Sequence, residues 1–245
     1  MLSSRLRFDA YLFDLDGVLT PTAEIHMRAW QRTFDELFES EGIEPAYTSA
    51  DYFAYVDGKK RYDGVYALLQ SRGMELPWGD PADSPDARTV CGVGNRKNDL
   101  FSAVLRDEGI APYPGSLQLL DALRASSDAS FAVVSSSKNA EEVLRVSGLR
   151  DRFAVVVDGV VAERDGLPSK PAPDVFLRAA EVLGVDPARC AAFEDAISGV
   201  ASAAAGGFGE VIGVDRGSGA EALLRAGAHR IVNDLAELCE WREPR

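Results

Sequence analysis

The sequence predicts an α/β protein: a doubly wound, mainly parallel sheet with an α-helical domain inserted into it. Short apolar runs alternate with helical patterns along most of the chain, which is typical of a parallel sheet covered on both faces. The alternation breaks between residues 23 and 107, where the pattern is helical. We therefore expect a core domain of residues 1–21 and 108–245, which carries the sheet, and a helical cap domain of residues 22–107.

Six apolar runs have the length and composition of buried strands. The first of them ends in carboxylates and then Gly17, which indicates a turn at the end of the strand. The predicted strands are Ala10–Asp16, Phe131–Ser135, Phe153–Val157, Cys190–Glu194, Glu210–Val214 and a weaker one at His229–Val232.

Local signals mark the helices between these strands. Asn139 and Glu142 form an Asn-x-x-Glu capping signal, and Pro173 lies in the first turn of another helix. The predicted core helices are 117–123, 139–147, 173–183 and 196–205. In the cap, residues 77–85 form a loop rich in proline and aspartate.

The composition is that of a globular protein. A net charge of −13 opposes binding to nucleic acid and to anionic membranes, so we expect neither partner. No apolar leader follows the basic N-terminus and no apolar stretch approaches roughly 18 residues, so we expect a cytoplasmic protein. The widely spaced Cys91, Cys190 and Cys239 are expected to be structural thiols. We expect a monomer.

Polar side chains gather at the ends of the predicted strands, where ligands bind in open parallel sheets. They are Asp14 and Asp16, then Ser135 with Ser136, Ser137, Lys138 and Asn139, then Lys170 before a helix, and finally Glu194 and Asp195. Phosphoryl transfer needs a nucleophile, a divalent cation, a fixed positive group and an acid/base. The sequence therefore predicts this chemistry at one edge of the sheet.

The carboxylates suit the nucleophile, the acid/base and the ligands of the cation. Asp14 can be the nucleophile, because carboxylates form acyl phosphates. Asp16, on the same side of an extended segment, can be the acid/base and can offer its backbone carbonyl to a metal. Asp195 and Asp14 supply hard oxygens suited to Mg²⁺, and Glu194 can act on the metal through a water.

Ser135 and Lys170 would bind the phosphoryl oxygens, with backbone N–H groups after Asp14 and at the Asn139 helix start. Each motif alone also has a structural interpretation. The Asp-x-Asp and Glu-Asp pairs can cap turns or helices, the serine run can be a loop, and Lys170 can be a solvated charge. Their shared position at strand ends favours the catalytic interpretation.

Together, Asp14-Leu-Asp16-Gly-Val-Leu, Ser135, Lys170 and Glu194-Asp195 resemble the four motifs of the haloacid dehalogenase superfamily. The resemblance covers nearly the whole chain. It implies a Rossmann-like core, a helical cap inserted after the first motif, obligatory Mg²⁺ and a phosphoaspartate intermediate at Asp14.

The stretch from Thr20 to Trp30 resembles the β-phosphoglucomutases of that superfamily. The resemblance places Thr22 and His26 in the hinge between core and cap, where the histidine would steady the acid/base aspartate. The alternative is a surface or interdomain histidine on an amphipathic helix. The resemblance also implies that Arg61, Lys97 and Asn98 clamp the non-transferring phosphate, helped by the core residues Ser137, Lys138 and Asn139. The clusters 59–61 and 95–98 would then lie together, although Lys59 and Lys60 can equally be solvated.

The implied activity is conversion of β-glucose 1-phosphate to glucose 6-phosphate through glucose 1,6-bisphosphate, with water excluded by cap closure. Pro21, Gly64 and the 77–85 loop depart from the subfamily pattern and leave a sugar-phosphate phosphatase as the alternative. A receiver-like switch that responds to phosphorylation is a third interpretation. The helical insertion and its basic clusters argue against it.

Overall fold

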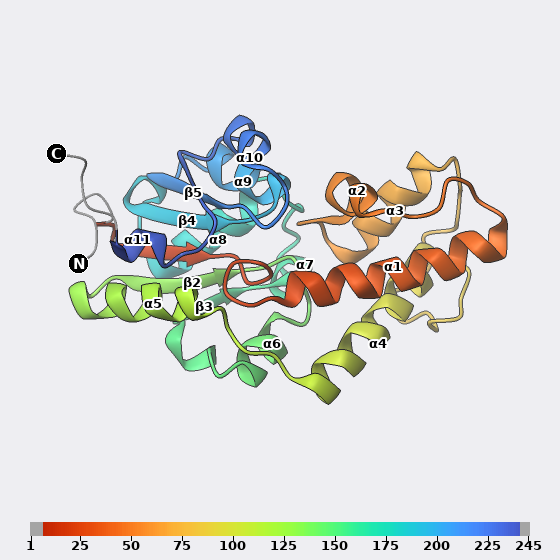
Figure 1. The fold of residues 1–245 in the computed structure, drawn as a ribbon, viewed down its shortest axis with the longest axis horizontal. Coiled ribbons are helices and arrows are strands. Elements are labelled where there is room, and N and C mark those ends of the chain that lie inside the picture. Colours follow the sequence, from red (N-terminus) through yellow and green to blue (C-terminus); the bar gives the residue numbers. More distant parts are fainter. Residues whose placement is uncertain (1–6, 241–245) are drawn as a thin grey trace. The chain divides into compact units, whose positions relative to one another are not determined.

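Six parallel strands form one sheet in the computed structural model, which describes residues 7–240 (Figure 1). The order β3-β2-β1-β4-β5-β6 shows that the chain builds outward from β1 in both directions. The strands are β1 (Ala10–Phe13), β2 (Ser130–Val134), β3 (Val155–Val157), β4 (Cys190–Glu194), β5 (Glu210–Val214) and β6 (Arg230–Val232). This topology confirms the predicted doubly wound α/β fold.

Helices cover both faces of this sheet. They are α5 (Pro114–Ser126), α6 (Ala140–Val146), α7 (Gly159–Arg164), α8 (Asp174–Leu183), α9 (Ile197–Ala205), α10 (Ala220–Ala226) and α11 (Glu237–Glu240), with single 3₁₀ turns η2 (Arg150–Arg152) and η3 (Pro187–Arg189). Successive side chains of β1 pack on opposite faces of the sheet, as strand geometry requires. Leu12 belongs to the core cluster that includes Phe176 of α8, whereas Phe13 stacks on Phe193 with ring centroids 4.4 Å apart.

Some predicted boundaries differ from the structure. The first strand ends at Phe13, so Asp14 to Asp16 lie in the loop after it and Asp16 forms only a single bridge with Thr20. Asn139 holds the N-cap position of α6, as predicted, but its side chain makes no capping bond. Its backbone N–H instead donates to Ser137 Oγ, at 3.1 Å. Helix α8 begins at Asp174, with Pro173 at its N-cap.

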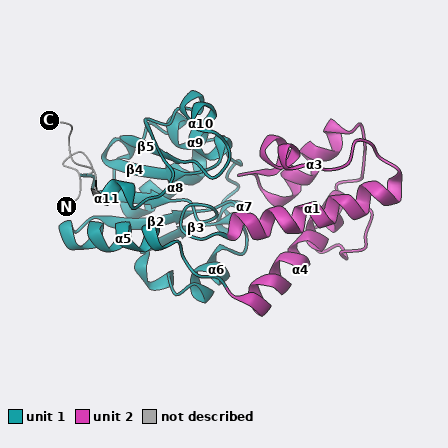
Figure 2. Cartoon of the chain, viewed as in Figure 1, with its two compact units in different colours: residues 1–21, 110–245 teal, residues 22–109 magenta. Residues whose placement is uncertain are grey.

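The chain divides into two compact units (Figure 2). Unit 1 comprises residues 1–21 and 110–245 and contains the sheet; unit 2 comprises residues 22–109. Unit 2 is helical, with α1 (Thr22–Glu41), α2 (Ser49–Asp51), the π-helical turn η1 (Tyr52–Val56), α3 (Arg61–Ser71) and α4 (Val90–Glu108). No helix between residues 7 and 240 is both long and apolar enough to span a bilayer.

The two junctions of unit 1 are hydrogen-bonded to each other. Tyr113 N–H donates to Leu19 O at 3.0 Å, and Ser116 Oγ donates to Val18 O at 2.7 Å. Both pairs join the loop after β1 to the start of α5. The chain therefore leaves unit 1 and re-enters it at points that lie side by side.

Unit 2 has its own apolar core and a largely buried ion pair. Asp51 Oδ2 accepts from Arg72 Nη2 at 2.7 Å and from the Thr48 N–H and Oγ1, both at 2.9 Å. Burial raises the pKa of Asp51, but the bonds from Arg72 and Thr48 outweigh it and the net pKa is lowered. A carboxyl group whose pKa is lower in the folded than in the unfolded protein stabilises the fold at a pH above its unfolded-state pKa. That stability is lost as the pH falls through the folded-state pKa.

The Asp51→Asn variant is therefore expected to lose about 2 kcal/mol of unfolding free energy near neutral pH. The difference in unfolding free energy between the variant and wild type should decrease below pH ~4, the ordinary pKa of an aspartate, because the wild-type carboxyl then becomes protonated. Urea denaturation across this pH range measures it. The exposed Asp86→Asn is the control. A deficit that does not change with pH would contradict the argument.

Candidate active site

Lys170 connects three neighbouring strand ends. Its ammonium donates to Asp14 Oδ1 at 2.7 Å, to Glu194 Oε1 at 2.5 Å and to Val134 O at 3.3 Å. These acceptors follow β1, end β4 and end β2, which are adjacent in the sheet. The lysine side chain is 1% exposed, so it is not the solvated charge of the alternative interpretation.

One ammonium therefore serves two buried carboxylates. Burial raises the pKa of Asp14 well above its usual range; Lys170 opposes this, whereas Glu194 and Asp16 add to it. For Lys170, burial lowers the pKa, but the two carboxylates more than compensate and the net shift is upward. Lys170 thus stays a cation, and the surplus negative charge of the cluster favours a further positive group beside Asp14.

Asp16 lies next to Ser135 at the same strand edge. Ser135 Oγ donates to Asp16 Oδ2 at 3.4 Å, a long bond, and accepts from the Ser137 N–H at 3.0 Å. Residues 14–16 do not continue the strand as expected, because β1 ends at Phe13 and the chain bends at Leu15. The two aspartates nevertheless lie close enough for Asp16 to contribute to the raised pKa of Asp14.

Asp195 packs against the loop that follows Asp14. Gly17 has φ +85°, and a Cβ on it would lie 1.9 Å from Asp195 Oδ2. Only glycine therefore allows the carboxylate to come so near the backbone of this loop. Both oxygens of Glu194 have donors: Oε1 accepts from Lys170, and Oε2 accepts from the Ala196 N–H at 2.9 Å. Its carboxylate also fills the place of a Cβ on Gly199.

The loop after β5 hydrogen-bonds to the loops that follow β1 and β4. The sequence analysis did not predict this role. Arg216 Nε donates to Gly17 O at 2.9 Å, and its guanidinium lies 4.0 Å from the centroid of Tyr113. Ser218 Oγ donates to Asp195 O at 3.0 Å. The signal in the sequence was weak, because an Arg-Gly-Ser-Gly run reads as a turn. Its position after a predicted strand end was the available clue.

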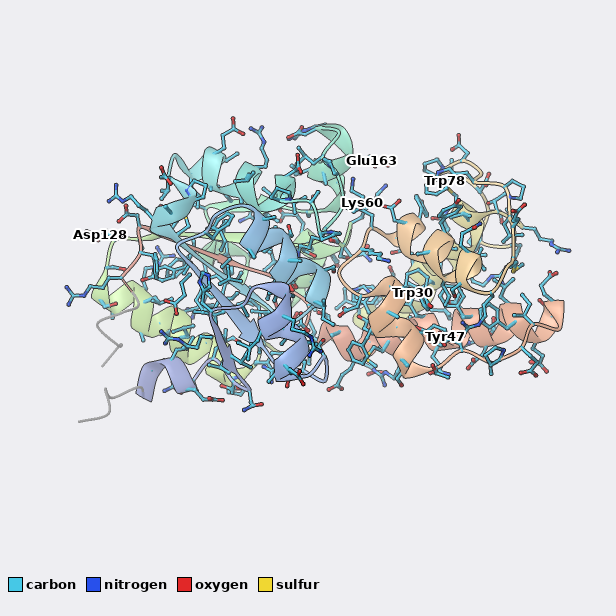
Figure 3. The ribbon with its side chains drawn as sticks, turned by 90° about the horizontal axis from the view of Figure 1, so that it is seen from above. Trp30, Tyr47, Lys60, Trp78, Asp128 and Glu163 are labelled. Atoms are coloured by element: carbon cyan, nitrogen blue, oxygen red, sulfur yellow. The ribbon has the colours of Figure 1, made fainter. Side chains whose placement is uncertain are left out.

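The serine run after β2 forms a compact turn. Lys138 pairs with Glu163 of α7 at 2.7 Å, a partner that the sequence did not suggest because α7 was not predicted (Figure 3 labels Glu163). Ser136 and Ser137 are partly buried, and Ser137 Oγ holds the Asn139 N–H. This turn lies directly after the strand end that bears Ser135.

Few carboxylates are available to bind a metal ion at the C-terminal ends of the strands. Within residues 7–240, no three His, Cys, Asp or Glu side chains are grouped in a way that would hold a metal ion. A site here would need two side-chain carboxylates supplemented by backbone oxygen. Such mixed oxygen sets suit Mg²⁺, which is bound by few carboxylates and retains several waters.

In unit 2, the structure places His26 and Lys97 together inside the helical bundle. The Lys97 ammonium contacts His26 Nδ1, and it lies 5.0 Å from the ring centroids of both Trp30 and Phe101 (Figure 3 labels Trp30). His26 stacks on Phe101 with centroids 4.1 Å apart. Lys97 is only 4% exposed, and Thr22, at the start of α1, is fully buried.

The two basic clusters of unit 2 lie side by side, as expected, but they contact each other directly. Arg61 Nη2 donates to Asn98 Oδ1 at 2.6 Å, and Arg61 Nη1 lies 3.5 Å from Asn95 Oδ1. Tyr62 also donates to Asn95 Oδ1, at 2.9 Å. Their proximity therefore does not require a shared ligand.

Comparison with known proteins assigns this arrangement to a family. A family model described as haloacid dehalogenase-like hydrolase matches residues 8–207. The β-phosphoglucomutase of Mycobacterium bovis is 50% identical over 239 residues, which cover 94% of this chain and 90% of the relative.

Solved structures show the same fold. β-Phosphoglucomutase from Clostridium difficile superposes with a TM-score of 0.76 at 24% identity, covering 94% of this chain and 93% of that one. CbbY from Rhodobacter sphaeroides, in complex with xylulose-(1,5)bisphosphate, gives 0.71 at 26% identity and covers 94% and 96%. Both known proteins are thus similar to this chain along nearly their whole length.

Proposed function

Since this chain belongs to the haloacid dehalogenase-like hydrolase family and is a phosphoryl-transfer enzyme, we propose that it converts β-glucose 1-phosphate to glucose 6-phosphate. The observation that carries the proposal is the convergence of Asp14, Glu194 and the end of β2 on one buried ammonium, that of Lys170. The 50% sequence identity to a β-phosphoglucomutase, over 94% of the chain, supports the choice of substrate.

Asp14 is the proposed nucleophile. Lys170 donates to its Oδ1, so we assign the attack on phosphorus to Oδ2. A bond forms between Oδ2 and phosphorus while the bond from phosphorus to the sugar oxygen breaks. Asp16 would give the leaving oxygen a proton and would later take one from the attacking hydroxyl. Ser135 and Lys170 would hold the phosphoryl oxygens in the meantime.

Mg²⁺ is the proposed cofactor, and the oxygens present suit it. Asp14 and Asp195 would hold the ion with the backbone carbonyl of Asp16; the close packing of Asp195 against Gly17 supports this choice. When bound, the ion neutralises charge on the phosphate. Glu194 would support the site through Lys170 rather than coordinate, because Lys170 and the Ala196 N–H already occupy its oxygens.

The non-reacting phosphate of glucose 1,6-bisphosphate would bind to Arg61 and Asn98 of unit 2. A guanidinium suits this role because its fork matches two phosphate oxygens. Within unit 2, the buried Lys97 would orient His26 through their direct contact, and Thr22 is buried at the start of the same helix.

The test is incubation with β-glucose 1-phosphate, a trace of glucose 1,6-bisphosphate and Mg²⁺. We expect glucose 6-phosphate without stoichiometric release of inorganic phosphate, and no turnover in EDTA. A coupled glucose-6-phosphate dehydrogenase assay and a phosphate assay measure the two products. Release of inorganic phosphate as the main product would overturn the mutase assignment.

A sugar-phosphate phosphatase is the second candidate. The similarity to CbbY, solved with a sugar bisphosphate, favours it. The same proposed Asp14 chemistry would then end with water attacking the phosphoaspartate. A panel of hexose and pentose mono- and bisphosphates, assayed for inorganic phosphate, separates the two candidates.

A further inference from the structure

The loop from Pro77 to Thr89 has a defined conformation on unit 2. Val90 N–H donates to Pro77 O at 2.9 Å, and Cys91 N–H donates to Trp78 O at 3.0 Å, which joins the loop to the first turn of α4. Within the loop, Asp83 Oδ2 accepts from Thr89 Oγ1 at 2.6 Å and from the Asp80 N–H at 3.1 Å. Trp78, labelled in Figure 3, marks its beginning.

Asn95 of α4 links this loop to Arg61. Its Nδ2 donates to Pro81 O at 3.1 Å and to Asp83 O at 2.9 Å. Its Oδ1 accepts from Tyr62 OH at 2.9 Å and lies 3.5 Å from Arg61 Nη1. An amide has two N–H donors and two lone pairs, and all four are used here.

The orientation of this amide is determined by its neighbours. Reversing Asn95 would place its NH₂ group against the guanidinium and its oxygen against two carbonyls, so three of the four contacts would be lost and only the Tyr62 hydroxyl could still bond, as an acceptor. Asn98, one turn further along α4, accepts from Arg61 Nη2 at 2.6 Å. Two amides on one helix face thus hold both terminal nitrogens of Arg61.

We propose that Asn95 is a positioning residue that couples the 77–89 loop to Arg61 and thereby sets the affinity for the phosphate end of the substrate. The inference rests on the proposed function, because it takes Arg61 to be a phosphate ligand. A guanidinium already fixed in place loses less side-chain freedom when an anion binds, which raises affinity. Asn95 acts on binding through this ordering of Arg61, without touching the reacting atoms.

Three variants test the assignment. Asn95→Ala removes the link, and the isosteric Asn95→Asp keeps the two acceptor contacts but loses both donations to the loop and sets a carboxylate beside Arg61. Arg96→Ala is the matched control: Arg96 Nε donates to Pro85 O at 3.0 Å, so its loss also weakens the loop, but no contact with Arg61 is involved.

With β-glucose 1-phosphate, Asn95→Ala is expected to raise KM roughly tenfold, with kcat within about threefold of wild type. Asn95→Asp should raise KM further, because its carboxylate competes with phosphate for Arg61. Arg96→Ala should lower Tm while leaving KM within about twofold of wild type. An unchanged KM in both Asn95 variants, or an equal rise in Arg96→Ala, would overturn the inference.

A binding measurement separates this inference from the proposed function. Calorimetric titration of inorganic phosphate into wild type and the three variants requires no turnover. If wild type turns over no sugar phosphate, the proposed function fails, and weaker phosphate binding in the Asn95 variants than in Arg96→Ala still supports the role of Asn95. Equal phosphate affinity in all four proteins would overturn that role.

Discussion

Replacing Asp14 by asparagine is expected to lower kcat by roughly ten-thousandfold or more. An amide oxygen does not form the acyl phosphate that the proposed reaction requires. Activity is measured by the coupled assay, and phosphorylation by mass spectrometry of the intact protein after exposure to glucose 1,6-bisphosphate and Mg²⁺. Wild type should gain one phosphoryl group and Asp14→Asn none.

The same variant is expected to fold, with a Tm in EDTA at or above that of wild type. The asparagine oxygen can still accept from Lys170, and Glu194 still balances the ammonium. The carboxylate that is removed is one whose ionisation burial disfavours, as its raised pKa shows. The control is Asp128→Asn, because Asp128 is an exposed residue before β2 (labelled in Figure 3).

Turnover by Asp14→Asn within about tenfold of wild type would exclude Asp14 as the nucleophile. A phosphoryl group found on the variant would exclude it equally. Loss of activity together with loss of the folded state would instead refute the stability argument, because it would mean that the Asp14 carboxylate is needed to balance Lys170.

Replacing Lys170 by methionine is expected to have the largest effect on stability, a loss of about 3–5 kcal/mol of unfolding free energy. Methionine fills similar space but leaves Asp14 and Glu194 facing each other without a cation. Both acceptors are at most 9% exposed, so water cannot replace the ammonium. Urea denaturation in EDTA measures the loss.

The deficit of Lys170→Met should shrink at low pH. Burial and the neighbouring carboxylates already raise the pKa of Asp14 in the wild-type fold. A carboxyl group whose pKa is higher in the folded than in the unfolded protein destabilises the fold once the pH rises above its unfolded-state pKa. Lowering the pH therefore reduces the loss of unfolding free energy in the variant. Adding Asp14→Asn and Glu194→Gln to Lys170→Met should recover most of the lost stability, because the two carboxylates left without their cation are then neutral. A triple variant as unstable as the single one would contradict this explanation.

The fold could be predicted from the sequence because its central strands are continuous apolar runs. The bounds of β4 and β5 agree with the prediction, since each run is flanked by polar or turn residues. The first strand was predicted too long: Asp14 to Asp16 follow an apolar run without a break, and only the left-handed turn at Gly17 shows that the strand has ended. Short elements such as α7 and α10 were missed because one or two turns carry too few residues to show a helical period.

For the candidate site, the sequence predicted which residues meet but not how they are paired. Parallel strand ends meet at one edge, so the placement of Asp14, Ser135 and Glu194 at one edge followed from the predicted strands. Lys170 precedes a helix, and only its position in the motif order suggested that it would join them. Whether Lys170 would pair with one carboxylate or two depends on side-chain burial, which local patterns do not report. The roles of these residues stay predictions until the variants are measured.

The unit 2 residues were the least predictable. Lysines are rarely buried, so nothing in the sequence indicated that Lys97 would lie among aromatic rings and contact His26. Asn95 was placed in a basic cluster and given no role of its own. Its function as a link to the 77–89 loop depends on carbonyls twelve and fourteen positions away, which no local motif records.

The paired junctions at Leu19 with Tyr113 and at Val18 with Ser116 make the inserted segment an exchangeable module. Because its two ends meet, a linker of a few residues could close the sheet-bearing unit, with about 2 kcal/mol less loop-closure entropy than the long insertion requires. Residues 22–109 can therefore be exchanged for another segment while the six strands and their carboxylates keep the same register.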